Sequence, residues 1–288
     1  MSGKGRIGFV GLSIVLACSS QASLLLTAFS RPQVGLVAQS NILIWNPKTQ
    51  TEHLIQSSYF LSNTKSFAFV TPTPSVPVIE GATIDAFDLA RKTLYPAWKP
   101  KTANSMSDVE VKQNVRLGKL EATTIKATDV VALSDWMDKN GFKTNDEQKK
   151  WLEKYIQKRW YLTAFRYASE EKVLQTEPIR MSFKTNVPFN PYFGTQNGWV
   201  NGVRQELFLV SPVPLQGIVG AKQAWNAESK RHTFVTQESA KNLTKALGLP
   251  MDAIDKKSWV NQYVESGKGQ TNVDDIFFYP SAKPTKGK

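Results

Sequence analysis

The stretch NILIWNPKTQTEHLIQ, residues 41–56, decides the fold that we expect from the sequence. Two strand-like runs, residues 41–45 and 51–56, lie on either side of a segment that contains the turn formers Asn46 and Pro47. Strand-like runs separated by such residues are typical of a β-hairpin. We therefore predict a hairpin that turns within residues 46–49.

A third strand is expected directly after this hairpin, at residues 66–71. Phe67 and Phe69 would point to one face of it and the residues between and after them to the other, because side chains alternate along a strand. Proline lacks the N–H that a ladder needs, so we expect the pairing to end at Pro72 and Pro74.

Two helices have clear sequence signals at their starts. We expect Thr83 to cap the first, which would end before Pro96, and Thr128 or Asp129 to cap the second, which Asn140-Gly141 would end. The apolar residues expected on the buried sides are Ile84, Phe87 and Leu94 in the first helix and Val130, Leu133, Trp136 and Met137 in the second.

The rest of the chain mixes short strands with further helices. Strands are predicted at residues 115–126, 160–167, 178–184, 204–211 and 275–279, and helices at residues 145–157, 238–247 and 257–264. The regular alternation of strand and helix that indicates a parallel sheet is missing. We therefore expect an α+β fold: mixed, mainly antiparallel sheets with several short amphipathic helices.

The domain organisation follows from the same pass along the chain. We expect a signal segment at residues 1–22 and one α+β domain at residues 34–280, or two lobes joined by a long connection at residues 97–114. The basic tail, residues 281–288, contains proline and glycine and is predicted to be disordered.

The first 22 residues resemble an export signal. Lys4 and Arg6 precede an apolar run, residues 7–18, and Ser20-Gln21-Ala22 follows it. A positive start, a short apolar region and a small-x-small site are what the secretion machinery recognises. This pattern predicts a periplasmic or extracellular protein.

Three outcomes for this leader remain open. Cleavage after Ala22, the favoured one, would release a soluble protein that begins at Ser23. Alternatively, Val15-Leu16-Ala17-Cys18 resembles a bacterial lipobox, and acylation of Cys18 would tether the domain to a membrane. In the third outcome, residues 7–29 stay attached as an uncleaved span.

Composition indicates which kinds of partner are favoured and which kinds of site are excluded. The chain carries a net charge of +12, which favours an anionic envelope component, although no specific partner follows from it. Cys18 is the only cysteine, so the rest of the chain has no disulfide or thiolate metal site. We expect no cofactor and no nucleic acid partner, and contact with a membrane only through the N-terminal segment.

Five segments together resemble a bacterial envelope family, domain of unknown function 2330. They are residues 66–75 and 128–142, which carry its two main motifs, and residues 160–166, 188–192 and 274–278. The resemblance implies export and no known activity. Family members often carry cysteines just after the signal sequence, and this chain has none there, so no role of such cysteines transfers to it.

Catalytic motifs are mostly missing from the sequence, and we assign no catalytic residue. His53 and His232 have no zinc-site spacing and are predicted to be surface residues. Asp274 and Asp275 are the best acidic pair and could bind a hard cation. Since neighbours in a strand point to opposite faces, we favour two solvated acids at a strand entrance.

Two surfaces are candidates for binding. Lys150 and Lys154 belong to a basic helix with Trp151 and Tyr155, which could lie on an anionic membrane, although four-residue spacing favours a core-facing aromatic stripe. The second candidate is the loop of residues 186–202, where aromatic faces among amides could hold a sugar or a peptide. Its aromatic residues are Phe189, Tyr192, Phe193 and Trp199; aromatics that fold back over a sheet edge are the favoured alternative.

Together these features predict an exported cell-envelope protein that is most simply a non-catalytic binding or structural domain. One alternative is a cation-dependent hydrolase that uses Asp274 and Asp275. Another is a protein that binds an anionic membrane surface or wall polymer.

Overall fold

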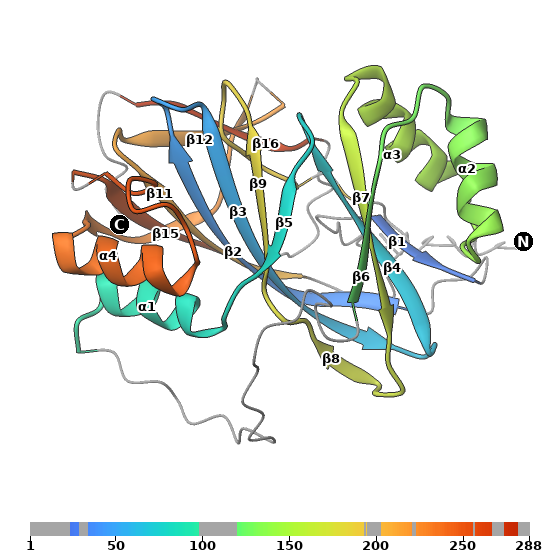
Figure 1. The fold of residues 1–288 in the computed structure, drawn as a ribbon, viewed down its shortest axis with the longest axis horizontal. Coiled ribbons are helices and arrows are strands. Elements are labelled where there is room, and N and C mark those ends of the chain that lie inside the picture. The colour runs from blue at the N-terminus through green and yellow to red at the C-terminus, as the bar shows by residue number, and fades with distance from the viewer. Residues whose placement is uncertain are drawn as a thin grey trace, which may run out of the picture.

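A computed structural model of the chain describes residues 24–28, 34–97, 120–192, 194, 203–220, 223–255, 257–266 and 274–281, and all statements below refer to these residues. Three β-sheets and four helices stack in layers (Figure 1). The predicted α+β class with mixed, mainly antiparallel sheets is confirmed.

The large sheet has eight strands. Its order is β14 (Glu228–Phe234), β15 (Trp259–Ser266), β11 (Arg204–Ser211), β2 (Val34–Asn46), β3 (Thr51–Ser62), β9 (Ile179–Lys184) and β5 (Val78–Gly81), with β8 (Val173–Gln175) paired to β3. The predicted hairpin is β2 and β3, with Ile42 opposite Ile55. Within the described chain, β2 and β11 make the one parallel pair.

Two four-stranded sheets accompany the large one. The first, which we call the helix-backed sheet, has the order β1 (Leu24–Thr27), β4 (Ser66–Thr73), β7 (Tyr161–Ala168) and β6 (Leu120–Ile125). The second, the small sheet, has the order β10 (Phe189–Asn190), β16 (Ile276–Pro280), β12 (Leu215–Val219) and β13 (Gln223–Ala224).

The four helices cover two outer faces. Helices α1 (Asp85–Leu94) and α4 (Gln237–Ala246) lie on one side of the large sheet, and α2 (Val130–Lys139) and α3 (Asp146–Gln157) lie beside the helix-backed sheet (Figure 1). Side-chain alternation produces this layering, because successive residues of a strand face different layers. Ile42 and Ile44 pack toward α1 and α4, whereas Leu43 packs toward the small sheet.

Strand β4 shows the predicted division of its two faces. Phe69 stacks on Phe165, with ring centroids 5.0 Å apart, in the core between the sheets. Ala68 and Val70 face α2 and α3 in a separate core. The predicted end of pairing at Pro72 is wrong, because β4 continues to Thr73. Proline is tolerated there since β1 pairs only as far as Val70, so one side of Pro72 has no described strand that needs its N–H.

Most helix boundaries match their sequence signals. The Asp129 side chain accepts a hydrogen bond from the backbone N–H of Ala132 at 2.8 Å, and Asn145 and Gln148 form a capping box. Gly141 follows α2 with a φ of 86°, and Gly248 follows α4 with a φ of 59°, which are left-handed values that glycine adopts readily.

Four details of the helix predictions are wrong. Thr83 does not cap α1: its hydroxyl donates to the carbonyl of Ala246, and the helix starts from Ile84 without a side-chain cap. Ile84 is 46% exposed and Trp136 is 37% exposed, so neither belongs to the buried side of its helix. The helix predicted at residues 257–264 is instead strand β15. The sequence pattern is ambiguous there, because residues four apart, such as Val260 and Val264, share one face of a strand as well as one face of a helix.

Several predictions lie outside the described residues. These are the leader with Cys18, almost all of the long connection at residues 97–114, the start of the strand predicted at residues 115–126, and nearly all of the tail at residues 281–288.

Replacing Phe69 with alanine tests the inter-sheet core. Phe69 is 1% exposed, so Phe69→Ala should lower the free energy of unfolding by about 3–5 kcal/mol. The matched control is Phe234→Ala, since Phe234 is 53% exposed and should cost much less. Equal losses in chemical denaturation would contradict the core assignment.

Candidate functional site

Three groups of residues that the sequence presents as separate candidates meet at one place in the structure. Asp274 and Asp275 lie at the entrance to β16, Lys154 lies on α3, and Tyr192 follows β10. We call this place the α3–β16 junction. It joins the helix-backed side of the molecule to the small sheet.

Helix α3 positions its half of the junction through its sequence pattern. Trp151 and Tyr155 are buried, with 1% and 0% exposure, and their rings lie 4.6 Å apart. The favoured interpretation, a core-facing aromatic stripe, is therefore confirmed, and these rings are not available to a membrane. Lys154 and Lys158, four residues apart, share the helix flank that faces the two acids.

Asp275 is the centre of the junction. Its side chain is 0% exposed, so the favoured interpretation of two solvated acids is wrong for this residue. The Tyr155 hydroxyl donates to both carboxylate oxygens, at 2.9 and 3.0 Å, and the backbone N–H of Tyr192 donates at 3.1 Å. The Lys158 ammonium lies 3.7 Å away. Such donors stabilise a carboxylate that has lost its hydration.

Asp274 lies at the partly exposed edge of the same cluster. Lys154 donates to it at 2.7 Å, the backbone N–H of Asp275 at 2.8 Å, and Lys158 lies 3.8 Å away. Partial burial opposes its ionisation, but the hydrogen bond from Lys154 and the other positive partners outweigh it, so the pKa of Asp274 is lowered. Burial, and then the charge of Asp275, raise the pKa of Tyr155. Tyr155 is thus a hydrogen-bond donor and not a base.

Lys158 lies among aromatic rings as well as acids. Its Nζ is 4.9 Å from the ring centroid of Trp160, 5.4 Å from that of Phe277 and 5.6 Å from that of Tyr155. A cation over ring faces is attracted by their negative quadrupole. Two lysines therefore neutralise two carboxylates within an aromatic setting.

The structure describes two of the four aromatic residues of the predicted binding loop. Phe189 belongs to β10, the end strand of the small sheet, and is fully buried among Trp160, Phe183 and Phe277. Tyr192 is 3% exposed and its hydroxyl donates to Glu265 at 2.6 Å. Phe193 and Trp199 lie outside the described residues.

A metal at Asp274 and Asp275 would need further ligands. Among the described residues, no three histidine, cysteine, aspartate or glutamate side chains gather closely enough to hold an ion. Lys154 and Lys158 already occupy the positions beside the carboxylates. Of the two lysines predicted to form a basic surface, Lys154 donates a hydrogen bond to Asp274, whereas Lys150 is exposed on α3.

Two buried ionisable groups on β3 were not anticipated. His53 is 7% exposed, so its prediction as a surface residue is wrong; its Nδ1 lies 2.8 Å from the Ser182 hydroxyl. Burial, with Arg180 and Lys184 nearby, lowers the pKa of His53 to about 4. Glu52 is fully buried and accepts the backbone N–H of Phe189 at 2.9 Å. Burial raises the pKa of Glu52 despite that hydrogen bond.

The sequence comparison identifies the family. Residues 29–197, more than half of the chain, match a family described as an uncharacterized protein conserved in bacteria (DUF2330). The chain belongs to this family, which confirms the resemblance noted from its motifs. No curated protein matches the sequence.

The structural comparison includes distant likenesses to baculovirus P35. The crystal structure of baculovirus P35 has a TM-score of 0.41 at 9% identity; the match covers 62% of this chain and spans 65% of that protein's length. A mutated baculovirus P35 after caspase cleavage and the caspase-8/P35 complex both have TM-scores of 0.32, at 9% and 8% identity; the matches cover 86% of this chain and 94% and 90% of those chains. Likenesses of this size support no inference about function.

Replacing Tyr155 with phenylalanine tests the junction. The variant removes the hydroxyl that donates to buried Asp275, so the free energy of unfolding should fall by about 1.5–3 kcal/mol. Tyr161→Phe is the matched control, because the Tyr161 hydroxyl only accepts an exposed hydrogen bond from Lys126. A Tyr155→Phe variant as stable as this control would contradict the role of the hydroxyl.

Replacing Glu52 with glutamine tests the buried acid on β3. The raised pKa of Glu52 means that the folded state favours the protonated form. The stability that protonated Glu52 contributes is therefore fully present below its ordinary pKa of 4.5 and is lost as the pH rises through its pKa in the folded protein. Glu52→Gln keeps an acceptor for Phe189 without the charge. Its melting temperature should exceed that of the wild type at pH 8 and approach it at pH 4.

The control for this experiment is Glu121→Gln, since Glu121 is exposed on β6. A gain for Glu52→Gln that is the same at both pH values would show that ionisation of Glu52 is not its cause.

Proposed function

We propose that this protein is exported and serves as a non-catalytic binding or structural domain of the bacterial cell envelope. The observation that carries the non-catalytic part of the proposal is the α3–β16 junction, where Asp275 receives hydrogen bonds from Tyr155 and Tyr192 and where two lysines balance the two acids. Groups satisfied in this way hold structure together and are not poised to transfer a proton or activate water.

The first described strand is compatible with cleavage of the leader after Ala22. Strand β1 begins at Leu24, and Leu24 and Leu26 are buried against α2 and α3. A cut after Ala22 leaves this strand whole. The alternative of one uncleaved span over residues 7–29 is disfavoured, because Leu24–Thr27 pair with β4 and cannot also belong to a membrane-spanning helix.

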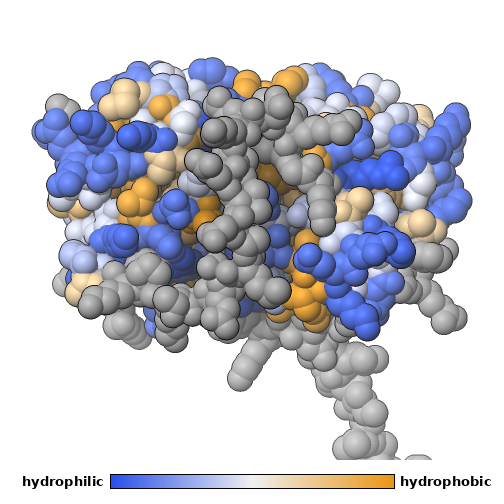
Figure 2. Space-filling view, turned by 60° about the horizontal axis from the view of Figure 1, so that its bottom comes forward, coloured by the Kyte–Doolittle hydropathy of each residue, from blue (hydrophilic) through white to orange (hydrophobic). Residues whose placement is uncertain are grey.

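No helix in the described part of the chain has both the length and the apolar character needed to cross a bilayer. On the face shown in Figure 2, hydrophobic side chains are visible at several places among hydrophilic ones.

Export is tested by fractionating cells and determining the mass of the mature N-terminus. We expect the protein in the periplasmic or secreted fraction, beginning at Ser23. A mature N-terminus at an acylated Cys18 would show that the protein is exported but tethered to a membrane and not released. An intact Met1 in the cytoplasmic fraction would overturn the proposal.

The hydrolase alternative is tested by calorimetry with Mg²⁺ and Ca²⁺. A metal would have to displace Lys154 and Lys158, so we expect no heat of binding for the wild type or for Asp275→Asn. Saturable binding that Asp275→Asn abolishes would favour the cation-dependent enzyme.

A further inference from the structure

The edge of the large sheet carries an exposed aromatic pair that the junction does not use. Strand β14 is the edge strand, and Phe234 lies directly opposite Trp259 of β15. Their ring centroids are 3.5 Å apart, and the His232 ring lies 5.8 Å from that of Trp259. Phe234 is nevertheless 53% exposed. We call Phe234, Trp259 and His232 the edge platform.

The small sheet does not extend over this platform. Tyr263, which shares a strand face with Trp259, packs 5.2 Å from Trp225 and belongs to the core beneath the small sheet. Four residues earlier on β15, Trp259 is covered by Phe234 instead. The outer face of Phe234 is thus open to solvent.

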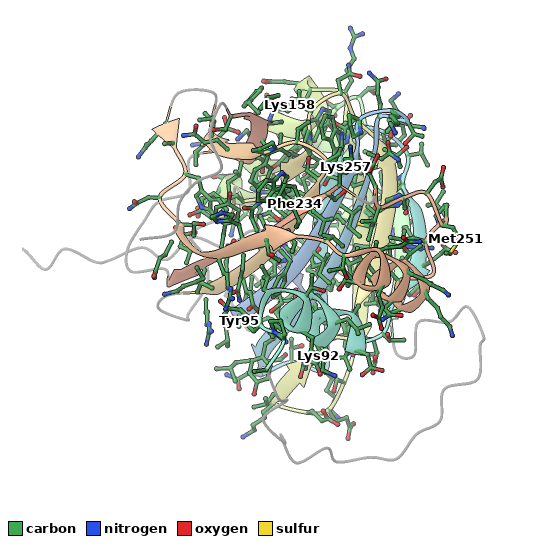
Figure 3. The ribbon with its side chains drawn as sticks, turned by 90° about the vertical axis from the view of Figure 1, so that its left-hand side faces the viewer. Lys92, Tyr95, Lys158, Phe234, Met251 and Lys257 are labelled. Carbon is green, nitrogen blue, oxygen red and sulfur yellow. The ribbon has the colours of Figure 1, made fainter. Side chains whose placement is uncertain are left out.

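An exposed lysine, Lys257, lies close to the platform along the chain. Lys257 is two residues before Trp259, and both Phe234 and Lys257 are labelled in Figure 3. The backbone N–H of Val235, next to Phe234, donates to the carbonyl of Ser258, next to Lys257, at 2.8 Å.

The neighbouring Asp255 carboxylate accepts the backbone N–H of Lys257 at 3.0 Å and binds Lys48 at 3.2 Å. These hydrogen bonds and the charges of both lysines lower the pKa of Asp255, so two lysines outnumber the one acid beside them. On β14 itself, Lys230 is paired with Glu228.

We propose that the edge platform binds an acidic glycan, with one sugar ring stacked on Phe234 and a carboxylate or phosphate group of the glycan at Lys257. This inference deepens the proposed function and rests on it for the envelope setting. The C–H face of a sugar ring complements the negative face of an aromatic ring, and the charge of Lys257 complements an acidic substituent.

A lipid surface fits this platform less well. Peripheral binding to a bilayer draws on several apolar side chains that enter the interface together. The platform offers one widely exposed ring, with the half-buried Trp259 and His232 behind it. One exposed ring matches one sugar residue and leaves the rest of the glycan to follow the sheet edge.

The test is calorimetry of the purified protein with a hexamer of galacturonic acid as the probe. Phe234→Ala and Lys257→Glu should each weaken binding about tenfold. Lys150→Glu is the matched control, because it makes the same charge change at an exposed site on α3 and should change the affinity less than twofold. Circular dichroism melts verify that each variant is folded.

Two further probes separate stacking from charge alone. Inorganic polyphosphate has the charge without the sugar, so Phe234→Ala should leave its binding unchanged. Equal effects of Lys257→Glu and Lys150→Glu, unaltered hexamer binding by Phe234→Ala, or no hexamer binding by the wild type would overturn the proposal. A further contradicting result would come from sedimentation with phosphatidylglycerol vesicles. If Phe234→Ala no longer sediments with the vesicles but still binds the hexamer, Phe234 contacts lipid and not a sugar.

Failure of this inference is distinguishable from failure of the proposed function. Binding of the hexamer is measured on purified protein and does not depend on where the protein resides. The mature N-terminus and the cell fraction, in contrast, test export alone.

Discussion

The structure depends on how one buried carboxylate, that of Asp275, is stabilised. A carboxylate removed from water costs several kcal/mol unless donors and a counter-charge replace its hydration. Here α3 supplies the Tyr155 hydroxyl, the residue directly after α3 supplies the Lys158 ammonium, and the segment after β10 supplies the N–H of Tyr192. The carboxylate therefore fixes the distance between the helix-backed side and the small sheet. Glu52 ties β10 to the large sheet in a similar way, through Phe189.

Much of the fold could be predicted because its signals are local. The β2–β3 hairpin, the capping box at Asn145 and the glycine after α4 each depend on residues a few positions apart. Short strands such as β1 and β5 lack that information, since four residues show no usable period. Strand β15 was mistaken for a helix because a spacing of four residues satisfies both periods.

The candidate site could be predicted only in pieces. The acids, the basic helix and the aromatic loop each had a recognisable composition, but Tyr155 and Asp275 are 120 positions apart, and no local pattern indicates their contact. Burial of His53 and Glu52 was equally hidden, because it depends on the layers packed on either face of β3. Of the predicted site residues, Asp274, Asp275, Lys154 and Tyr192 meet in one structural junction and not in separate binding sites, whereas Lys150 takes no part in it. Binding is better sought at the exposed edge of the sheet.

Amide hydrogen exchange in Asp275→Asn tests the central role of this carboxylate most directly. If Asp275 joins α3 to the small sheet, protection should fall together at Tyr192, along β16 and in the last turn of α3, while the β2–β3 hairpin keeps its protection. A loss confined to β16, with α3 and Tyr192 unchanged, would contradict the account.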